Sequence, residues 1–317
     1  MQIVAIDVGG THARFAFAEI QAGHVAHLGE PVVMRTADHE GLSSAWMAFV
    51  ASLGAAPPRA AAIGVAGPVT GGPVRFVNSH WVVDPDTLKA ELDIDDFILL
   101  NDFGAMAHAA HALGPDGIEH LCGPDVPLPE RGVISVIGPG TGLGVAALIR
   151  RAQDIVILET EGSHIHFAPQ GPSERWVSDL IAKEYGRTSV ERIVSGPGLG
   201  EIVRANDPDD IREDAELWEV ATLGIDAEAI EALDIFLGAY GAAVGDLSLA
   251  HGAMGVVLTG GLTNRIRKQL LASNFHARFC YKGRYRARME MIPVKLITHP
   301  QPGLFGAAAA FAKEHHA

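Results

Sequence analysis

The chain has 317 residues, of which 48% are hydrophobic and 20% are charged. One hydrophobic core stops growing below this length, so we expect two lobes of about 100 to 200 residues each. With 38 acidic and 24 basic residues, the formal charge is -14, which argues against nucleic acid as a partner.

The first two expected elements are apolar strands joined by a glycine-rich turn. Residues 3–18, IVAIDVGGTHARFAFA, place Asp7, two glycines and Thr11 between two apolar runs. One interpretation is an ordinary hairpin. The other is a turn that holds an anion, because glycines let backbone N–H groups approach a phosphate and a threonine hydroxyl adds a donor.

Helices and strands alternate in the next part of the chain. We expect a helix, a strand, a turn-rich segment, a strand and an alanine-rich helix over 41–54, 60–67, 68–81, 97–103 and 104–113. This alternation implies a layered α/β architecture. Asn78 and His80, just before Trp81, are further candidates for lining a binding site.

Asp102 follows Asn101 at the carboxyl end of an apolar strand, where open α/β sheets bind their ligands. A carboxylate there could orient an acceptor hydroxyl and take its proton late in a phosphoryl transfer. The alternative is that Asp102 caps the helix that follows.

A second strand–turn–strand segment occurs over 133–148, VISVIGPGTGLGVAAL. It can be laid over residues 3–18 without a gap, so that Gly140 falls on Gly10 and Thr141 on Thr11. Two lobes built on one plan would explain this match. We expect a small N-terminal lobe over 1–110, joined by the C-terminal helix 302–317, and a large lobe over 111–301.

Helices and strands continue to the end of the chain. We expect helices over 176–186 and 226–252, strands over 255–261 and 294–298, and a final helical segment over 300–316.

Three glycine-rich turns, at 7–11, 138–144 and 259–261, are candidates for phosphate binding. None has the P-loop pattern, and no clean G-x-G-x-x-G opens a helix. Each turn alone can be structural, but together they favour two lobes that hold one polyphosphate. Asp7 beside such amides would repel a phosphate unless a divalent cation, usually through water, lay between them. The alternative is that Asp7 starts a turn through its side chain.

Glu161, His164 and Glu191 form a candidate ligand set. Hydroxyl groups both donate and accept hydrogen bonds, so carboxylates and an imidazole would suit a ligand that carries several of them. A lone ExxH pattern is often plain surface. Arg14 could reach a phosphate or form an ion pair near Asp102.

The apolar runs and the cysteines bear on the location of the protein in the cell and on zinc binding. No run reaches the roughly 18 uninterrupted apolar residues of a membrane helix, since Asp246 and His251 break the longest one. We therefore expect a cytoplasmic protein with no membrane contact. Cys122 and Cys280 are too few for a zinc cluster, and two reduced thiols are favoured over one disulfide.

These stretches resemble bacterial glucokinases of the zinc-free, hexokinase-like group in the actin-fold sugar kinase superfamily. The matching stretches span residues 7 to 310 and are, in order, DVGGTHAR, LLNDF, GPGTGLGVA, EGSHIHFAP, VERIVSGPGL, GVVLTGG, YKGRY and PGLFGAAAA. The resemblance implies an α/β fold of two actin- or ribonuclease-H-like lobes, each with a mixed central sheet flanked by helices, and an interdomain cleft.

The resemblance also implies ATP-dependent phosphorylation of the 6-hydroxyl of glucose, with Mg²⁺ carried as MgATP, no zinc, and a homodimer. It makes Asp102 the catalytic base. The sugar ligands would be Asn101, Asp102, Glu161, His164 and Glu191. The nucleotide ligands would be Ile6, Asp7, Val8, Gly9, Gly10, Thr11, Gly140, Thr141, Gly142, Gly260 and Gly261.

Under the same resemblance, Asp7 would hold the magnesium through water. Two positions depart from the family: His12, where asparagine is usual, and His166, where aspartate is common; their effect stays open. The alternatives to a glucokinase are a kinase for another hexose or an amino sugar, and a sensor that binds sugar or nucleotide without catalysis.

Overall fold

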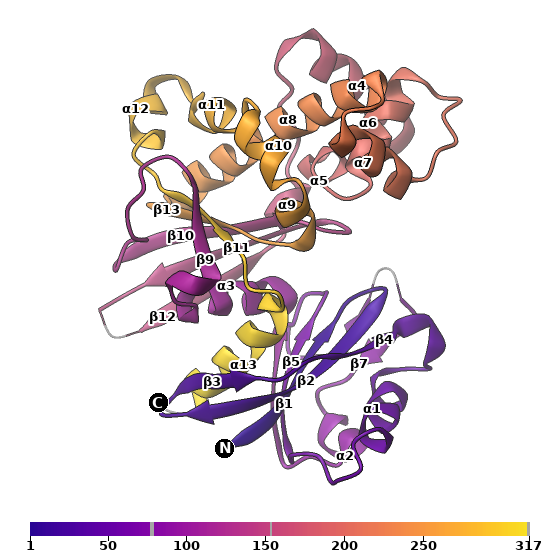
Figure 1. Ribbon diagram of the computed structural model, residues 1–317, viewed down its shortest axis with the longest axis vertical. Coiled ribbons are helices and arrows are strands. Elements are labelled where there is room, and N and C mark those ends of the chain that lie inside the picture. Colours follow the sequence, from indigo (N-terminus) through magenta and orange to yellow (C-terminus); the bar gives the residue numbers. More distant parts are fainter. Residues whose placement is uncertain (77–78, 153, 316–317) are drawn as a thin grey trace. The chain divides into compact units, whose positions relative to one another are not determined.

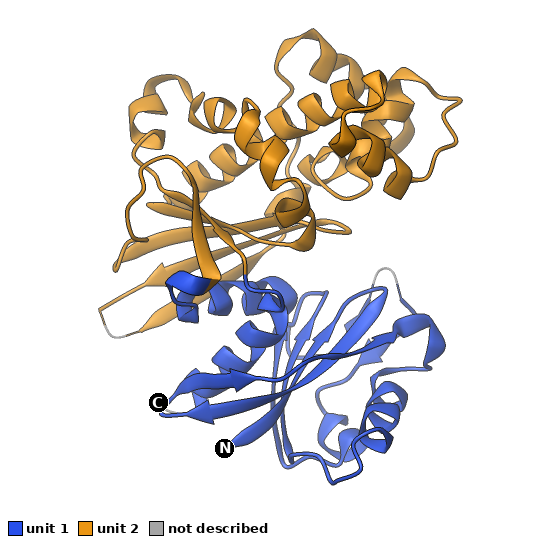
Figure 2. Ribbon diagram, in the orientation of Figure 1, with its two compact units in different colours: residues 1–116, 299–317 blue, residues 117–298 orange. Residues whose placement is uncertain are grey.

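Two mixed β-sheets organise the chain, one in each of two units (Figures 1 and 2). The computed structural model describes residues 1–76, 79–152 and 154–315. Unit 1 consists of Met1–Asp116 and His299–Ala317, and unit 2 of Gly117–Thr298. The two ends of the chain therefore belong to the same unit.

The sheet of unit 1 has the strand order β3-β2-β1-β5-β8, with β4 also paired to β2. Its strands are β1 Gln2–Val8, β2 His12–Gln21, β3 His24–Leu28, β4 Val32–Arg35, β5 Ala60–Val65 and β8 Asp96–Asn101. β1, β5 and β8 run parallel, so their carboxyl ends lie at one edge of the sheet, where Val8 is level with Val65 and Val65 with Asn101.

Helices cover both faces of this sheet. They are α1 Leu42–Ala51, α2 Leu88–Leu92, α3 Asp102–Ala112 and α13 Pro302–Glu314 (Figure 1). On one face Trp46 and Phe49 of α1 pack against Phe15 of β2. On the other face α13 packs on the sheet and on α3 so closely that a Cβ at Gly306 would clash with the backbone of Ala105. The strands and helices predicted within residues 1–113 are thus present, although the helix expected from residue 104 begins at Asp102.

Short elements connect the main ones. The strands β6 Val74–Arg75 and β7 Val82–Val83 and the 3-10 helix η1 Thr36–Asp38 belong to unit 1, and the 3-10 helix η2 Pro115–Gly117 spans the boundary between the two units in the sequence.

The sheet of unit 2 has the order β12-β11-β10-β13-β14-β9. Its strands are β9 Ile118–Cys122, β10 Gly132–Pro139, β11 Leu143–Arg150, β12 Ile155–Thr160, β13 Gly255–Leu258 and β14 Val294–Ile297. As in unit 1, the sheet contains an antiparallel hairpin, here β10–β11. The first strand of this hairpin, β10, has β13 as its other neighbour in the sheet and runs parallel to it.

The two hairpins are alike, but their turns differ by one residue. In the first, Val8 pairs with Ala13, and in the second, Pro139 pairs with Leu143. The gapless match of the two segments therefore does not hold through the turns, because the second turn has one residue fewer between the last paired positions.

The helices of unit 2 gather mainly on one face of its sheet (Figure 1). They are α4 Gly171–Tyr185, α5 Val190–Ile193, α6 Gly198–Asn206, α7 Asp214–Leu223, α8 Ala227–His251, α9 Gly261–Arg265, α10 Arg267–Ala272, α11 Phe275–Cys280 and α12 Arg286–Met289, with the 3-10 helices η3 Gly162–His164 and η4 Gly283–Tyr285. By length and composition α8 could cross a membrane, but 78% of its apolar window is buried inside the protein. Its apolar character is thus accounted for by the core of unit 2.

Both cysteines are free thiols, as predicted. Cys122 is half-buried, Cys280 is buried, and burial raises the pKa of Cys122 to about 12.

Candidate functional site

Asp7 lies in β1 directly opposite Arg14 of β2. Arg14 Nη1 donates a hydrogen bond to Asp7 Oδ2 at 3.2 Å. Burial raises the pKa of Asp7, and the charge of Arg14 acts in the opposite direction. Asp7 is therefore the last residue but one of a strand rather than the start of a turn, and Arg14 forms its ion pair with Asp7.

The turn after Asp7 is fixed by Thr36 of η1. Thr36 Oγ1 donates to Gly10 O at 2.7 Å, and Thr36 N donates to Thr11 O at 3.0 Å. Gly9 N also donates to His12 O at 2.9 Å. In a trans peptide the N–H points opposite to the C=O, so the N–H of Thr11 is directed away from Thr36. Thr36 carried no signal in the sequence that links it to this turn.

The N-terminal turn of α13 lies against Asp7. A Cβ at Gly303 would come within 3.2 Å of the Asp7 carboxyl carbon. A helix N-terminus favours a neighbouring negative charge. Gly303 belongs to the stretch PGLFGAAAA that carries the resemblance, but its place beside Asp7 was not predicted.

Asn101 and Asp102 have different structural roles. Asn101 is the N-cap of α3: its Oδ1 accepts from Phe103 N at 2.9 Å and Gly104 N at 3.2 Å, and its Nδ2 donates to Gly67 O at 3.1 Å. Asp102 is the first residue of the helix and accepts from Phe103 N at 2.9 Å. The alternative that Asp102 caps this helix is therefore wrong, because Asn101 does so.

Unit 2 brings Glu161, His164 and Glu191 together. His164 Nε2 lies 3.6 Å from Glu161 Oε2, and His164 Nδ1 lies 4.0 Å from Glu191 Oε1. Glu161 is the N-cap residue of η3, while Glu191 lies in the first turn of α5, which the Ser189 side chain caps. The imidazole thus lies between two carboxylates from segments that are distant in the sequence.

Backbone hydrogen bonds hold η3 and α5 side by side. Val190 N donates to Ile165 O at 3.0 Å and Phe167 N donates to Thr188 O at 3.0 Å. His166 lies between these two bonds, where its Nδ1 is 2.8 Å from Thr188 O. His166 therefore helps to fasten the two segments.

The β10–β11 turn, Gly140 to Gly142, adjoins this carboxylate group. Leu143 N donates to Glu191 Oε2 at 2.9 Å. A Cβ at Gly142 would clash with the same oxygen. On the other side of the turn, Gly196 N donates to Gly140 O at 2.6 Å.

The turn 259–261 lies beside the end of β10, where the β10–β11 turn begins. Thr259 N donates to Ile137 O at 3.0 Å. Gly260 has a φ of 97°, and a Cβ there would come within 2.9 Å of Pro139 O. Both the backbone conformation and the close approach require glycine at this position. Gly261 begins α9.

The remaining candidates are His12, His80 and Asn78. His12 begins β2 and pairs with Arg35 of β4. His80 Nε2 lies 3.2 Å from His39 O, and Trp81 Nε1 donates to the same oxygen at 3.1 Å. Asn78 lies outside the described residues.

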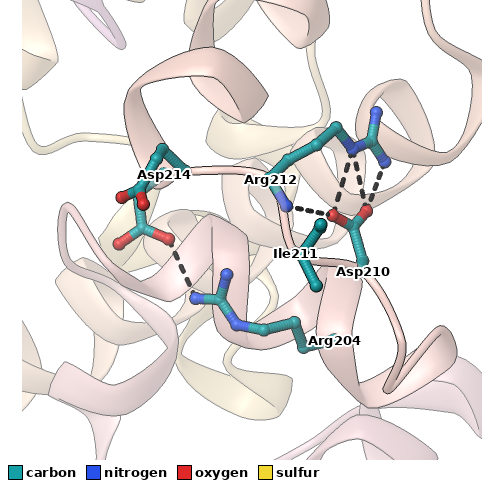
Figure 3. Close-up of a pocket in the computed structure, with 6 residues that line it drawn as sticks. Arg204, Asp210, Ile211, Arg212 and Asp214 are labelled. Atoms are coloured by element: carbon teal, nitrogen blue, oxygen red, sulfur yellow. Dashed lines mark hydrogen bonds and ion pairs between the residues drawn. The ribbon is translucent and has the colours of Figure 1, made fainter.

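A hollow of about 350 Å³ in unit 2 contains none of the predicted site residues (Figure 3). It is lined by Arg204, Asp210, Ile211, Arg212, Glu213 and Asp214. Its charges are paired internally: Arg204 donates to Asp214 at 2.8 Å, and Arg212 forms several hydrogen bonds with Asp210. This pairing leaves little net charge to attract an ionic ligand.

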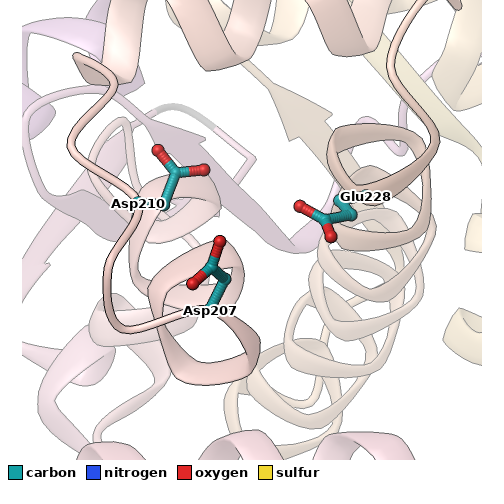
Figure 4. A group of neighbouring side chains, drawn as sticks. All are labelled: Asp207, Asp210 and Glu228. Carbon is teal, nitrogen blue, oxygen red and sulfur yellow. The ribbon is translucent and has the colours of Figure 1, made fainter.

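Three carboxylates near this hollow come close together, namely Asp207, Asp210 and Glu228 (Figure 4). Their oxygen atoms lie within 4.8 Å of one another. The Arg212 side chain approaches Glu228 to 3.8 Å as well as binding Asp210, so it compensates this negative charge.

Comparison with known proteins gives matches over the full length of the chain. A family model described as Glucokinase matches residues 4–314. The glucokinase of Zymomonas mobilis subsp. mobilis is 49% identical over 320 residues, which cover 99% of each chain. The crystal structure of a glucokinase from an Antarctic psychrotroph has a TM-score of 0.82 at 30% identity, covering 98% of each chain.

A more distant likeness concerns the fold. A ROK family glucokinase from Streptomyces griseus, in complex with glucose and AMPPNP, has a TM-score of 0.67 at 20% identity, covering 99% of this chain and all of that one. These structures confirm the predicted fold class of two sugar-kinase lobes.

Proposed function

Because this chain belongs to the glucokinase family, we propose that it transfers the γ-phosphoryl group of ATP to the 6-hydroxyl of glucose and releases glucose 6-phosphate and ADP. The observation that carries the proposal is the common edge of the unit 1 sheet. There β1 ends just after Asp7 and β8 ends at Asn101, so a candidate phosphate turn and the carboxylate of Asp102 follow strands of one sheet.

Asp102 is the proposed catalytic base. A sugar hydroxyl is a weak nucleophile, so a carboxylate that orients it and takes its proton lowers the barrier. The hydroxyl oxygen forms a bond to the γ-phosphorus, the bond from that phosphorus to the β-phosphate oxygen breaks, and the proton passes to Asp102 and then to solvent. The Asn101 side chain, which caps α3, fixes the backbone from which Asp102 projects.

Asp7 is the proposed magnesium ligand, through water. Burial disfavours its ionised form, and the Arg14 ion pair compensates, so the site suits a carboxylate that faces positive charge. Bound Mg²⁺ would neutralise charge on the phosphates. The residues offer hard oxygen ligands rather than thiolates, which favours magnesium over zinc.

The two glycine turns are the proposed phosphate-binding elements. In unit 1, the N–H of Thr11 is directed away from Thr36, and in unit 2, Gly140 to Gly142 form a tight turn next to Gly260. The other proposed nucleotide contacts are Ile6, Val8, Gly9, Gly10, Thr141 and Gly261.

Glu161, His164 and Glu191 are the proposed sugar ligands of unit 2, with Asn101 and Asp102 from unit 1. The spacing of the imidazole between two carboxylates offers alternating donors and acceptors, as neighbouring sugar hydroxyls require. We further propose a homodimer that acts in the cytoplasm.

The test is a coupled assay of ADP release with MgATP and a panel of glucose, mannose, fructose, glucosamine and N-acetylglucosamine. We expect glucose to give the highest kcat/KM. A higher value for another sugar would contradict glucose as the substrate, and sugar-independent ADP release would contradict a kinase.

Asp102→Asn tests the base. We expect kcat to fall by about a hundredfold or more while the glucose Kd changes only a few-fold, because the amide keeps the shape but cannot take a proton. Asp116→Asn, which alters an exposed carboxylate of η2, is the matched control. Turnover near that of the wild type would contradict the assignment.

A further inference from the structure

Glu191 directs its two carboxylate oxygens at two different parts of unit 2. Oε2 accepts the N–H of Leu143, at the end of the β10–β11 turn, at 2.9 Å. Oε1 faces His164 Nδ1 at 4.0 Å. The side chain is 31% exposed, so it is accessible to a ligand even though the turn holds Oε2.

Gly142 leaves the space that this carboxylate occupies. A Cβ there would clash with Glu191 Oε2 and come within 3.1 Å of its carboxyl carbon. Gly142 does not have a positive φ, and the three atoms nearest to a Cβ there all belong to the Glu191 carboxylate, so this contact accounts for glycine at the position. At Gly140, in the same turn, a Cβ would meet no atom within 4 Å.

The segment that carries Glu191 is held firmly enough to transmit this contact. Ser189 caps α5, and Val190 N donates to Ile165 O. Farther along the segment, Gly196 N donates to Gly140 O at 2.6 Å, and Trp218 Nε1 donates to Gly196 O at 2.7 Å. The turn is therefore attached to this segment at both of its ends.

We infer that Gly142 and Leu143 are positioning residues for the acceptor site. Gly142 leaves room for the Glu191 carboxylate and the N–H of Leu143 holds it, so the conformation of the 140–142 turn sets the affinity for glucose through Glu191. The inference rests on the proposed function, in which Glu191 binds the sugar and the turn binds a phosphate. Because coupling between two sites is reciprocal, glucose bound at Glu191 also stabilises the turn for nucleotide.

The first experiment measures glucose binding by calorimetry in the absence of any nucleotide. In Gly142→Ala the new methyl group displaces the carboxylate and breaks its bond to Leu143, so we expect the glucose Kd to rise about fivefold or more. Gly140→Ala adds the same methyl group to the same turn without a neighbour, and its glucose Kd is expected to stay within twofold of the wild type. Equal glucose affinities in the two variants would overturn the inference and leave the proposed function standing.

The second experiment works in the reverse direction and does not depend on the folding of Gly142→Ala. Glu191→Ala removes the acceptor of Leu143 N–H, so we expect the Kd of Mg-AMPPNP, without sugar, to rise about threefold or more. Glu161→Ala removes another proposed sugar ligand, one that forms no hydrogen bond with residues 140–142, and is expected to leave that Kd unchanged. The same nucleotide Kd in both variants would overturn the inference. Absence of glucose binding by the wild type would instead overturn the proposed function, and the inference with it.

Discussion

His108 is a half-buried histidine of α3 whose pKa is shifted downward. Burial lowers its pKa to about 4, and the positive charges of Lys313 and His111 act in the same direction. An unfolded chain has a histidine pKa of about 6.5, so between that pH and about 4 the unfolded state binds a proton at His108 that the folded state does not bind. The stability contributed by neutral His108 is therefore fully present above about pH 6.5 and is lost as the pH falls toward 4.

This residue gives a prediction for acid stability. Between pH 7 and pH 5 the His108 contribution to the free energy of unfolding should fall by about 2 kcal/mol. His108→Gln, which cannot titrate, should show a correspondingly flatter pH dependence in urea unfolding measured at both pH values. His24→Gln, at an exposed position of β3, is the control and should keep the slope of the wild type. An unchanged slope in His108→Gln would contradict the assignment.

Single residues were predictable where one side chain defines the chemistry. A carboxylate at the end of an apolar strand identified Asp7 and Asp102 as candidates, and the strand pattern itself places them there: Asp7 is the last residue but one of β1, and Asp102 directly follows β8. Thr36 and Gly303 could not be predicted, because their contacts with the turn and with Asp7 join segments that are distant in the sequence. The Asn101 cap was missed because two adjacent residues, Asn101 and Asp102, are both good capping types.

The crossing of α8 and α11 depends on glycines along one side of α8. Gly238, Gly241 and Gly245 are three and four residues apart and therefore lie on one face of the helix. A Cβ at Gly241 would clash with the backbone of Phe275, and one at Gly245 would come within 2.5 Å of Phe279 O. At Gly238 the nearest atoms are the ends of flexible side chains, Asn274 Oδ1 at 3.1 Å and Arg278 Nη1 at 3.3 Å.

Two alanine substitutions in this helix should therefore have different effects on the free energy of unfolding. Gly241→Ala should lower the free energy of unfolding by about 2 kcal/mol or more, since the backbone of α11 must move. Gly238→Ala should be within about 1 kcal/mol of the wild type, because a gain in helix propensity offsets a small side-chain adjustment. Urea midpoints measure both, and equal losses would contradict a backbone contact specific to Gly241.

Long helices with a clear apolar period were predictable from the sequence, but their first and last residues were less so. The helix expected over 226–252 is α8, Ala227–His251, because its apolar residues repeat at helical spacing. The helix expected over 176–186 begins at Gly171, since Pro172 at its start is a residue that tolerates the first turn. The different lengths of the two hairpin turns could not be read from a gapless match, because turn length depends on contacts such as Gly196 with Gly140.

At the scale of the whole molecule, unit 1 is completed by the last helix of the chain. Leu304, Ala307 and Phe311 of α13 are buried in one cluster with Ile3 and Ala5 of β1. Unit 2 is one continuous segment, whereas unit 1 needs both ends.

Removal of residues 299–317 should therefore affect the two units differently. We expect limited proteolysis to cut within residues 1–116 while 117–298 stays protected, because only unit 1 loses part of its core. Phe311→Ala is the milder variant. It should lower the free energy of unfolding by about 3 to 5 kcal/mol. Its native state should still resist the protease. Mass spectrometry of the fragments is the measurement, and equal protection of both parts would contradict the role given to α13.

The position of α13 also orders events during synthesis. β1 leaves the ribosome well before α13, so the cluster that buries Ile3 and Ala5 closes only after Phe311 has emerged. Unit 2 has all of its residues available earlier and can fold before unit 1 is finished. A chain that stops short of α13 would thus carry Asp7 and Asp102 on an incomplete scaffold, and such products would be targets for proteases rather than working catalysts.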